Sequence, residues 1–288
     1  METLTIERRP TQSLVVEGRR IVFHTRGRDH GPVTRVVSPS GTGERIKPFV
    51  FLDHFDAMSA TGPRMSGIHP HSGIATITVL LQGGLRYEDT TGKTGILPAG
   101  GVEWMRAGGG VWHDGEPLPG ANLHGLQLWI ALPAAEENGP AESQYIAPQN
   151  VPHQGPVRII LGSYGEAKSP IRAPSGINYL DVHMKDGQRW EYQPPAGHDV
   201  AWVFSYKGSL RAEGQPVAVK ELAVFEEGQS ALRFDARGDT GFVLGTAVKH
   251  PHDLVLGYYS VHTSAQALEA GEAEIRRIGE RLRASGRL

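Results

Sequence analysis

Three histidines in the first half of the chain have the residue type and spacing of a metal site. His69 and His71 stand two positions apart in the segment His69-Pro70-His71-Ser72-Gly73. Side chains alternate between the two faces of a strand, so both imidazoles share one face if this segment is extended. His113 follows after enough chain for a sheet to fold back. Since neutral imidazole is the commonest protein ligand for first-row metals, the pattern predicts a metal site inside a small β-barrel.

The alternative is that these histidines are exposed, or satisfied within a core, and share this spacing by chance. The glycines around them favour the metal site. Gly73, Gly83, Gly100 and the run 108–110 supply the sharp turns that a barrel makes around a site. A metal-free structural barrel is the remaining interpretation.

Two carboxylates that follow His113, Asp114 and Glu116, are candidates for a fourth, acidic ligand. In a regular strand both lie on the face opposite His113. A β-bulge at Gly115 would bring Glu116 to the metal, because glycine has no side chain to obstruct one and Pro117 ends strand pairing. If Glu116 does not bind the metal, it is the candidate general base. Both carboxylates could instead be solvated, with water as the fourth ligand.

Short strands are predicted on both sides of these residues. Residues 13–24 indicate a hairpin with Glu17-Gly18 near its turn, and 48–55, 74–81 and 123–132 indicate strands. Gln82-Gly83-Gly84 indicates a further hairpin turn. The segment 133–156 is rich in Pro, Glu, Asn and Gln, which is typical of a linker between domains.

A second strand-rich half begins at residue 157. We therefore expect an all-β fold of two antiparallel barrels packed together: a metal-binding domain over 1–132, a linker over 133–156 and a barrel without a metal site over 157–288. Apolar residues such as Trp202 and Phe204 are expected to fill the second barrel. The chain should end in a helix outside the barrels, with Ser264 as N-cap, a kink or break at Gly271 and an end at Gly286.

Composition excludes several classes of protein. The 288 residues include no cysteine, which rules out disulfides, thiol catalysis and cysteine-bound zinc or iron–sulfur sites. A net charge of −2 gives no overall attraction to nucleic acid or to an anionic membrane. No apolar run reaches the roughly 20 residues that span a bilayer, and residues 1–10 lack an apolar signal core. The expected location is the cytoplasm.

Several segments together resemble the N-terminal barrel of the pirins, two-barrel members (bicupins) of the cupin superfamily. They are His69-Pro70-His71-Ser72-Gly73, Leu81-Gln82-Gly83-Gly84, Glu103-Trp104-Met105, Ala107-Gly108-Gly109-Gly110-Val111-Trp112-His113 and Gly125-Leu126-Gln127-Leu128-Trp129. The resemblance runs in order from about Phe49 to the linker. The second half has weaker matches, among them Tyr259-Ser260-Val261-His262-Thr263-Ser264.

The resemblance implies one iron ion held by three histidines and a glutamate, with His69, His71 and His113 as the histidines. Fe²⁺ is the metal it implies, and another divalent first-row ion is the alternative. In the family the last two ligands follow the pattern His-x-Glu. Here Gly115 occupies the position of that glutamate, and Glu116 comes one place later. The acid found in the first motif of many cupins is also replaced, by Ala75.

Two functions follow from the resemblance. Bacterial pirins are associated with quercetin 2,3-dioxygenase activity, so the first hypothesis is an oxidoreductase that cleaves quercetin or a related flavonol or aromatic enol with O₂. Animal pirins are nuclear transcriptional co-regulators. The alternative is therefore a metal-dependent regulatory protein that binds a protein partner without catalysis.

Overall fold

The first half of the chain folds into two facing antiparallel sheets. The computed structural model describes residues 18–57, 67–120 and 122–288. The larger sheet has the order β12 (Glu142–Ile146), β9 (Val102–Arg106), β6 (Ile74–Gln82), β11 (Leu123–Ala131), β4 (Phe49–Ala57), β3 (Val33–Val37) and β2 (Arg28–His30). The smaller has the order β5 (His69–His71), β10 (Val111–Pro117), β7 (Gly84–Asp89) and β8 (Thr94–Pro98). A short helix, α1 (Thr42–Ile46), precedes β4.

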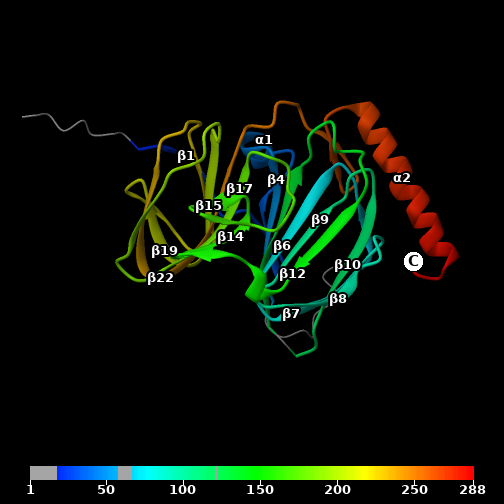
Figure 1. The fold of residues 1–288 in the computed structure, drawn as a ribbon, viewed down its shortest axis with the longest axis horizontal. Helices are drawn as coiled ribbons and strands as arrows, with labels where there is room; N and C mark the ends of the chain where they lie inside the picture. The colour runs from blue at the N-terminus through cyan, green and yellow to red at the C-terminus, as the bar shows by residue number, and fades with distance from the viewer. Residues whose placement is uncertain (1–17, 58–66, 121) are drawn as a thin grey trace, which may run out of the picture.

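The second half forms one large antiparallel sheet that wraps into a second barrel (Figure 1). Its order is β1 (Ile21–Thr25), β21 (Glu221–Phe225), β19 (Val200–Ala212), β22 (Leu232–Ala247), β17 (Ile177–Met184), β14 (Val157–Leu161) and β13 (His153–Gln154). β18 (Arg189–Tyr192) pairs with β22, and β20 (Gln215–Val217) with β19. Two small hairpins pair β15 (Ser163–Tyr164) with β16 (Ala167–Lys168), and β23 (Val255–Gly257) with β24 (Ser260–His262). The predicted all-β fold of two barrels with a terminal helix is confirmed.

The two ends of the described chain are exchanged between the barrels. β1 comes before every strand of the first barrel, yet it pairs with β21 in the second. The terminal helix α2 (Ala265–Ala284) lies along the outside of the first barrel beside β10, as the red helix in Figure 1 shows. The predicted hairpin over 13–24 lies partly outside the described residues, and its second strand pairs with β21.

A shared apolar cluster joins the barrels. In β6 the side chains of Ala75, Ile77 and Val79 face the second barrel, so both faces of this strand are buried, although two buried threonines interrupt its apolar residues. Trp202 meets Phe49 of the first barrel edge to face, with ring centroids 5.4 Å apart.

The second barrel is filled by a different set of side chains from the predicted one. Trp202 and Phe204 belong to the cluster between the barrels. Their neighbours Ala201 and Val203 point inward, because side chains alternate along β19. The interior cluster also holds the rings of Trp190, Tyr192, Phe225, Phe234 and Phe242. The interior of the second barrel is apolar as expected, but it is the opposite face of β19 from the predicted one that points into it.

Helix α2 begins and ends where the sequence indicates. The hydroxyl of Ser264 accepts a hydrogen bond from the Ala267 amide, and Gly286 adopts a left-handed φ of 71° just beyond the helix. The expected break at Gly271 is wrong, because the helix is continuous; a kink there stays a prediction. Gly271 is buried, close to Ser72 of the first barrel. None of the helices in the described part of the chain is long and apolar enough to span a membrane.

The linker expected over 133–156 contains ordered elements. β12 adds to the first barrel by pairing with β9, the 3₁₀ helix η1 (Pro148–Asn150) follows, and β13 adds to the second barrel. The domain boundaries themselves stay a prediction. The turn at Gln82-Gly83-Gly84 does not close a hairpin, since β6 and β7 belong to different sheets; it is a corner of the barrel.

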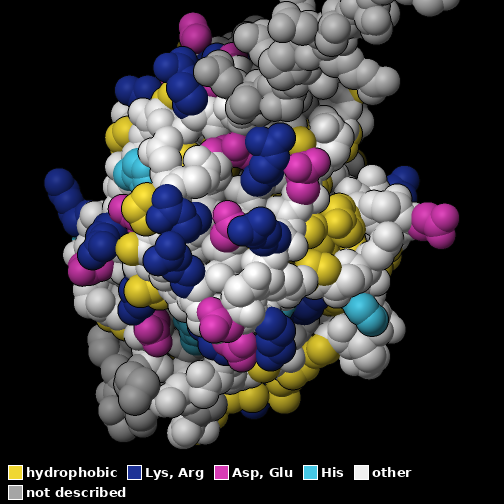
Figure 2. Space-filling view, turned by 90° about the vertical axis from the view of Figure 1, so that its left-hand side faces the viewer, with side chains coloured by type: hydrophobic (Ala, Val, Ile, Leu, Met, Phe, Trp, Pro, Cys, Tyr) yellow, Lys and Arg dark blue, Asp and Glu magenta, His cyan; other side chains and the backbone are white. Residues whose placement is uncertain are grey.

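The outer end of the second barrel carries charges of both signs. On the face in Figure 2, basic side chains are interspersed with acidic ones. Strands β18 and β22 of this barrel form ion pairs with each other, such as Arg189–Asp235 at 3.0 Å and Arg233–Glu191 at 3.0 Å. This face therefore has no extended region of a single charge.

Candidate metal centre

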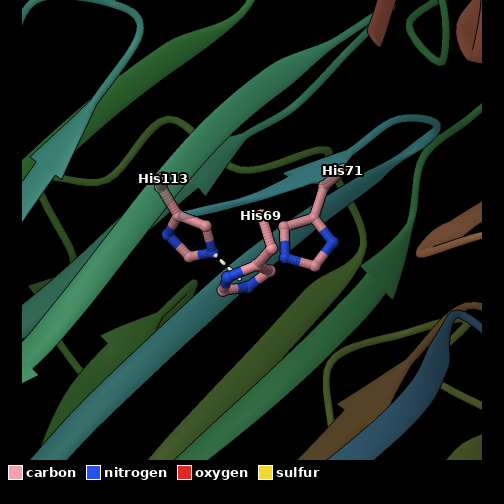
Figure 3. A group of neighbouring side chains, drawn as sticks. All are labelled: His69, His71 and His113. Carbon is pink, nitrogen blue, oxygen red and sulfur yellow. Dashed lines mark hydrogen bonds between the residues drawn. The ribbon is translucent and has the colours of Figure 1, made fainter. Parts of the chain in front are cut away.

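Strand pairing brings the three predicted histidines together. β5 and β10 are antiparallel neighbours, and their register sets His113 directly opposite His69. His71 lies two positions along β5 on the same face. The ring centroid of His69 is 4.5 Å from that of His113 and 5.0 Å from that of His71. Figure 3 shows the three rings converging from the two strands.

Each ring has an oxygen acceptor at Nδ1. For His69 it is the carbonyl of Gly67 at 2.8 Å, and for His71 it is the carbonyl of Tyr259 at 3.1 Å. For His113 it is the carboxylate of Glu103 at 3.4 Å. Because these oxygens only accept, each Nδ1 carries a hydrogen, and a ring that is neutral then presents the lone pair of Nε2 to the centre.

With each Nδ1 directed at an oxygen, the Nε2 atoms of the three rings face one another. Those of His69 and His113 are 3.1 Å apart, and that of His71 is buried without a hydrogen-bond partner among the described residues. The possible ligand atoms of these three residues all lie within 4.8 Å of one another. Among the described residues, no other group of three or more His, Asp or Glu side chains is placed to hold a metal ion. Converging lone pairs repel unless a cation lies between them, so the donor set fits a metal ion.

Burial keeps the imidazoles of His69 and His71 neutral. Loss of solvent, followed by the neighbouring His113, lowers the pKa of His69 to about 4. The same two effects, with His69 as a further neighbour, lower the pKa of His71 well below its ordinary value. At neutral pH both rings are therefore unprotonated, which is the form that binds a metal.

Sequence analysis missed the role of Glu103. It lies on β9, in the sheet that faces the histidines, and is buried. Burial alone would raise its pKa, but the hydrogen bond and charge interaction with His113 outweigh burial and leave the pKa below its ordinary value. Tyr145 donates a further, long hydrogen bond to the same oxygen, at 3.4 Å. Glu103 is thus an anion behind His113, positioned to orient that ring.

A cavity of about 460 Å³ opens over His69 and His113. One wall is aromatic, where the rings of Phe51 and Trp129 stack at 4.0 Å. The guanidinium of Arg35 lies 4.1 Å from the centroid of the Phe51 ring and forms a bidentate ion pair with Asp53. Residues of the β23–β24 hairpin complete the wall: Leu256, Gly257, Tyr259, Ser260 and Val261. The cavity suits a flat, largely apolar molecule.

Known proteins resemble the chain over most of its length. A family model described as Pirin matches residues 31–130. A Pseudomonas aeruginosa protein provisionally named a quercetin 2,3-dioxygenase is 34% identical over 244 residues, which cover 78% of this chain and 83% of that protein. The chain belongs to the pirin family. Human pirin is 29% identical to it over 219 residues, or 72% of this chain and 73% of human pirin.

Solved structures show the same pirin fold. A crystal structure of quercetin 2,3-dioxygenase from Acinetobacter baumannii superimposes with a TM-score of 0.82 at 24% identity, over 90% of this chain and 97% of that one. The bacterial pirin YhhW from Escherichia coli, solved with nickel(II), gives a TM-score of 0.61 at 20% identity, over 79% and 96% of the two chains. The bicupin fold implied by the pirin resemblance is therefore shown.

The acidic ligand implied by the pirin resemblance does not reach the three histidines here. β10 runs in continuous register with β7 from His113 to Pro117, so the bulge expected at Gly115 is not formed. Alternation then puts Glu116 on the face opposite His113, and its side chain is exposed. Asp114 and Gly115 line the cavity, whereas Glu116 does not. The structure therefore brings together three histidines without a glutamate among them, and Glu103 lies behind one of the three.

Proposed function

We propose that this pirin is a mononuclear metal protein that uses O₂ to cleave a flavonol such as quercetin, or a related aromatic enol. The observation that carries the proposal is the set of three Nε2 lone pairs converging at a cavity of about 460 Å³ with an aromatic wall. Relatives provisionally named quercetin 2,3-dioxygenases support the choice of substrate.

His69, His71 and His113 would hold the ion, with Fe²⁺ as the proposed metal. The ion would supply Lewis acidity toward an enol oxygen and the one-electron chemistry that O₂ requires. The chain supplies binding and orientation. Phe51 and Trp129 would form an aromatic wall beside the substrate, and residues of the β23–β24 hairpin line the same cavity.

The general base must be a residue other than Glu116, the candidate that the sequence suggested. Glu116 is exposed and does not line the cavity, so it does not reach a substrate oxygen there. The carboxylates that can face the cavity are those of Asp53 and Glu103, because alternation along β10 turns the side chain of Asp114 away from His113. Asp53 is held by Arg35 and Glu103 by His113. A proton that leaves the substrate would pass to one of these carboxylates.

The test combines metal analysis with O₂ uptake on the purified protein. After removal of metal and reloading with Fe²⁺, we expect one ion per chain and consumption of O₂ that depends on added quercetin. His69→Ala, His71→Ala and His113→Ala should each lose the ion and the activity while keeping the circular dichroism of the parent. Retention of iron at parental stoichiometry in these variants would contradict the ligand assignment.

One result would separate catalysis from binding. If the parent holds iron but consumes no O₂ with quercetin or related enols, the enzyme proposal is wrong. The alternative of a metal-dependent regulatory protein would then be the better account.

A further inference from the structure

The metal centre is completed by residues from the far end of the chain. Strand β24 contacts β6, and helix α2 contacts β5 as well as both strands of the β23–β24 hairpin. The bond between His71 Nδ1 and the Tyr259 carbonyl joins residues 188 positions apart. Ser72, the residue after His71, forms a parallel bridge with Ser260. The first barrel alone therefore lacks the acceptor for one of its three imidazoles.

Tyr259 has a backbone conformation that its side chain disfavours. Its φ is 56°, in the left-handed region where a residue other than glycine is uncommon. Such a conformation costs on the order of 1 kcal/mol or more and persists only when the surroundings enforce it. Here it accompanies the placement of the Tyr259 carbonyl 3.1 Å from Nδ1 of His71. The strain coincides with the contact that sets the orientation of a metal ligand.

A buried polar network anchors the strained residue. Ser72 Oγ lies 2.8 Å from Ser260 Oγ and 3.0 Å from Nε2 of His262. The carboxylate of Glu137 accepts from Nδ1 of His262 at 3.1 Å, and also from the Thr263 amide and hydroxyl at 2.7 and 2.6 Å. Ser72, Glu137, Ser260 and His262 are all buried. One carboxylate thus fixes the chain just after Tyr259 through three hydrogen bonds.

Glycines on both sides let the network close. A Cβ added to Gly73 would lie 2.0 Å from the Val261 carbonyl oxygen and 2.7 Å from the His262 ring. One added to Gly271 of α2 would lie 2.6 Å from both His262 Nε2 and Ser72 Oγ. The hairpin and helix therefore approach β5 more closely than any other residue at these positions would permit.

We propose that Tyr259 is a positioning residue for His71, and that Glu137 acts through His262 to hold Tyr259 in place. The Tyr259 carbonyl keeps the hydrogen of His71 on Nδ1, so that Nε2 faces the metal position. This inference rests on the proposed metal site and adds a dependence of that site on the C-terminal segment. Groups that orient metal-bound histidines typically change metal affinity by about 10–100-fold when they are removed.

The first test separates the Tyr259 carbonyl from its ring. Tyr259→Gly removes the ring but adopts a φ of 56° without strain, so the carbonyl stays and metal affinity should remain within about threefold of the parent. Tyr259→Val and Tyr259→Pro also remove the ring but oppose that φ, so affinity should fall about tenfold or more. The probe is Co²⁺, measured by chelator competition and by its visible absorption, which reports the ligand geometry. Circular dichroism checks the fold of each variant.

The second test acts at the far end of the network. Glu137→Ala should weaken Co²⁺ binding about tenfold and change its absorption spectrum. Glu136→Ala is the matched control, because Glu136 is a neighbouring carboxylate that is more exposed and pairs only loosely with Arg106, at 3.7 Å. It should leave both measurements unchanged.

The outcomes separate this inference from the proposed function. If the parent binds no divalent metal, the metal site itself is wrong. If the parent binds Co²⁺ and folded Tyr259→Val and Glu137→Ala bind it equally well with the parental spectrum, the site stands and the positioning role is overturned. Equal losses in Tyr259→Gly and Tyr259→Val would also overturn it, because the ring rather than the carbonyl would then matter.

Discussion

Glu103 and Glu116 allow a direct comparison of two glutamates near the metal centre. Glutamine at either position keeps the shape of the side chain and removes one negative charge. Glu103 is buried and its carboxylate lies 3.4 Å from Nδ1 of His113, whereas Glu116 is exposed on the opposite face of β10. We therefore expect Glu103→Gln to weaken metal binding and Glu116→Gln to leave it nearly unchanged.

The distance sets the expected size of the effect. Partners of metal-bound histidines typically contribute about 10–100-fold to affinity. At 3.4 Å the Glu103 contact is longer than the usual 2.7–3.2 Å range, so we expect the lower end, about tenfold, or about 1.4 kcal/mol. Glu116 is separated from the site by the strand and screened by solvent, so its loss should change affinity by less than about twofold.

Chelator competition with Co²⁺ or Fe²⁺ in one buffer measures both variants against the parent. Thermal unfolding of the metal-free proteins shows whether either substitution alters the fold. A larger loss for Glu116→Gln than for Glu103→Gln would mean that β10 carries the bulge at Gly115 and that Glu116 binds the ion. Equal, small effects would refute the orienting role of Glu103.

Three further predictions concern the scaffold. Burial, then the neighbouring His124, lowers the pKa of His54 to about 4, so the folded state should lose up to about 3 kcal/mol as pH falls from 6.5 to 4. In metal-free protein, His54→Gln should reduce the loss of unfolding free energy at acid pH, as measured by urea titration. His153→Gln, at an exposed position, should not reduce it. Gly271→Ala should lower thermal stability by about 1–3 kcal/mol despite the better helix propensity of alanine, because its Cβ has no room; a gain would contradict the close approach. Trp202→Ala should cost about 3–5 kcal/mol in a single transition that includes both barrels; two separate transitions would contradict the shared core.

The histidine site could be predicted because its determinants are local. The two-residue spacing of His69 and His71 fixes their shared face in any extended conformation. The return of His113 required only that a barrel form, and the glycines between indicate one. What sequence could not provide was register. The pairing that sets His113 opposite His69 also turns Glu116 away, and nothing in the segment after His113 shows whether Gly115 forms a bulge.

Residues that act across sheets left no signal in the sequence. Glu103 is ten positions before His113 but reaches it from the opposing sheet, a relation that spacing along one strand does not reveal. Trp202 and Phe204 were correctly expected to be buried, yet the choice between the two faces of β19 depends on the neighbouring barrel. The contact of Tyr259 with His71 depends on the path of the whole chain.

The distance in sequence between His71 and Tyr259 has a consequence for biosynthesis. Ribosomes make the chain from its N-terminus at about 5–20 residues per second, so the 188 positions between the two residues take roughly 10–40 s to synthesise. In the later part of that interval, after β12 has been synthesised, the strands of the first barrel are available, but the carbonyl that orients His71 does not yet exist. The nascent protein therefore passes through a stage in which the strands of its first barrel have been made while the imidazole of His71 still lacks its acceptor.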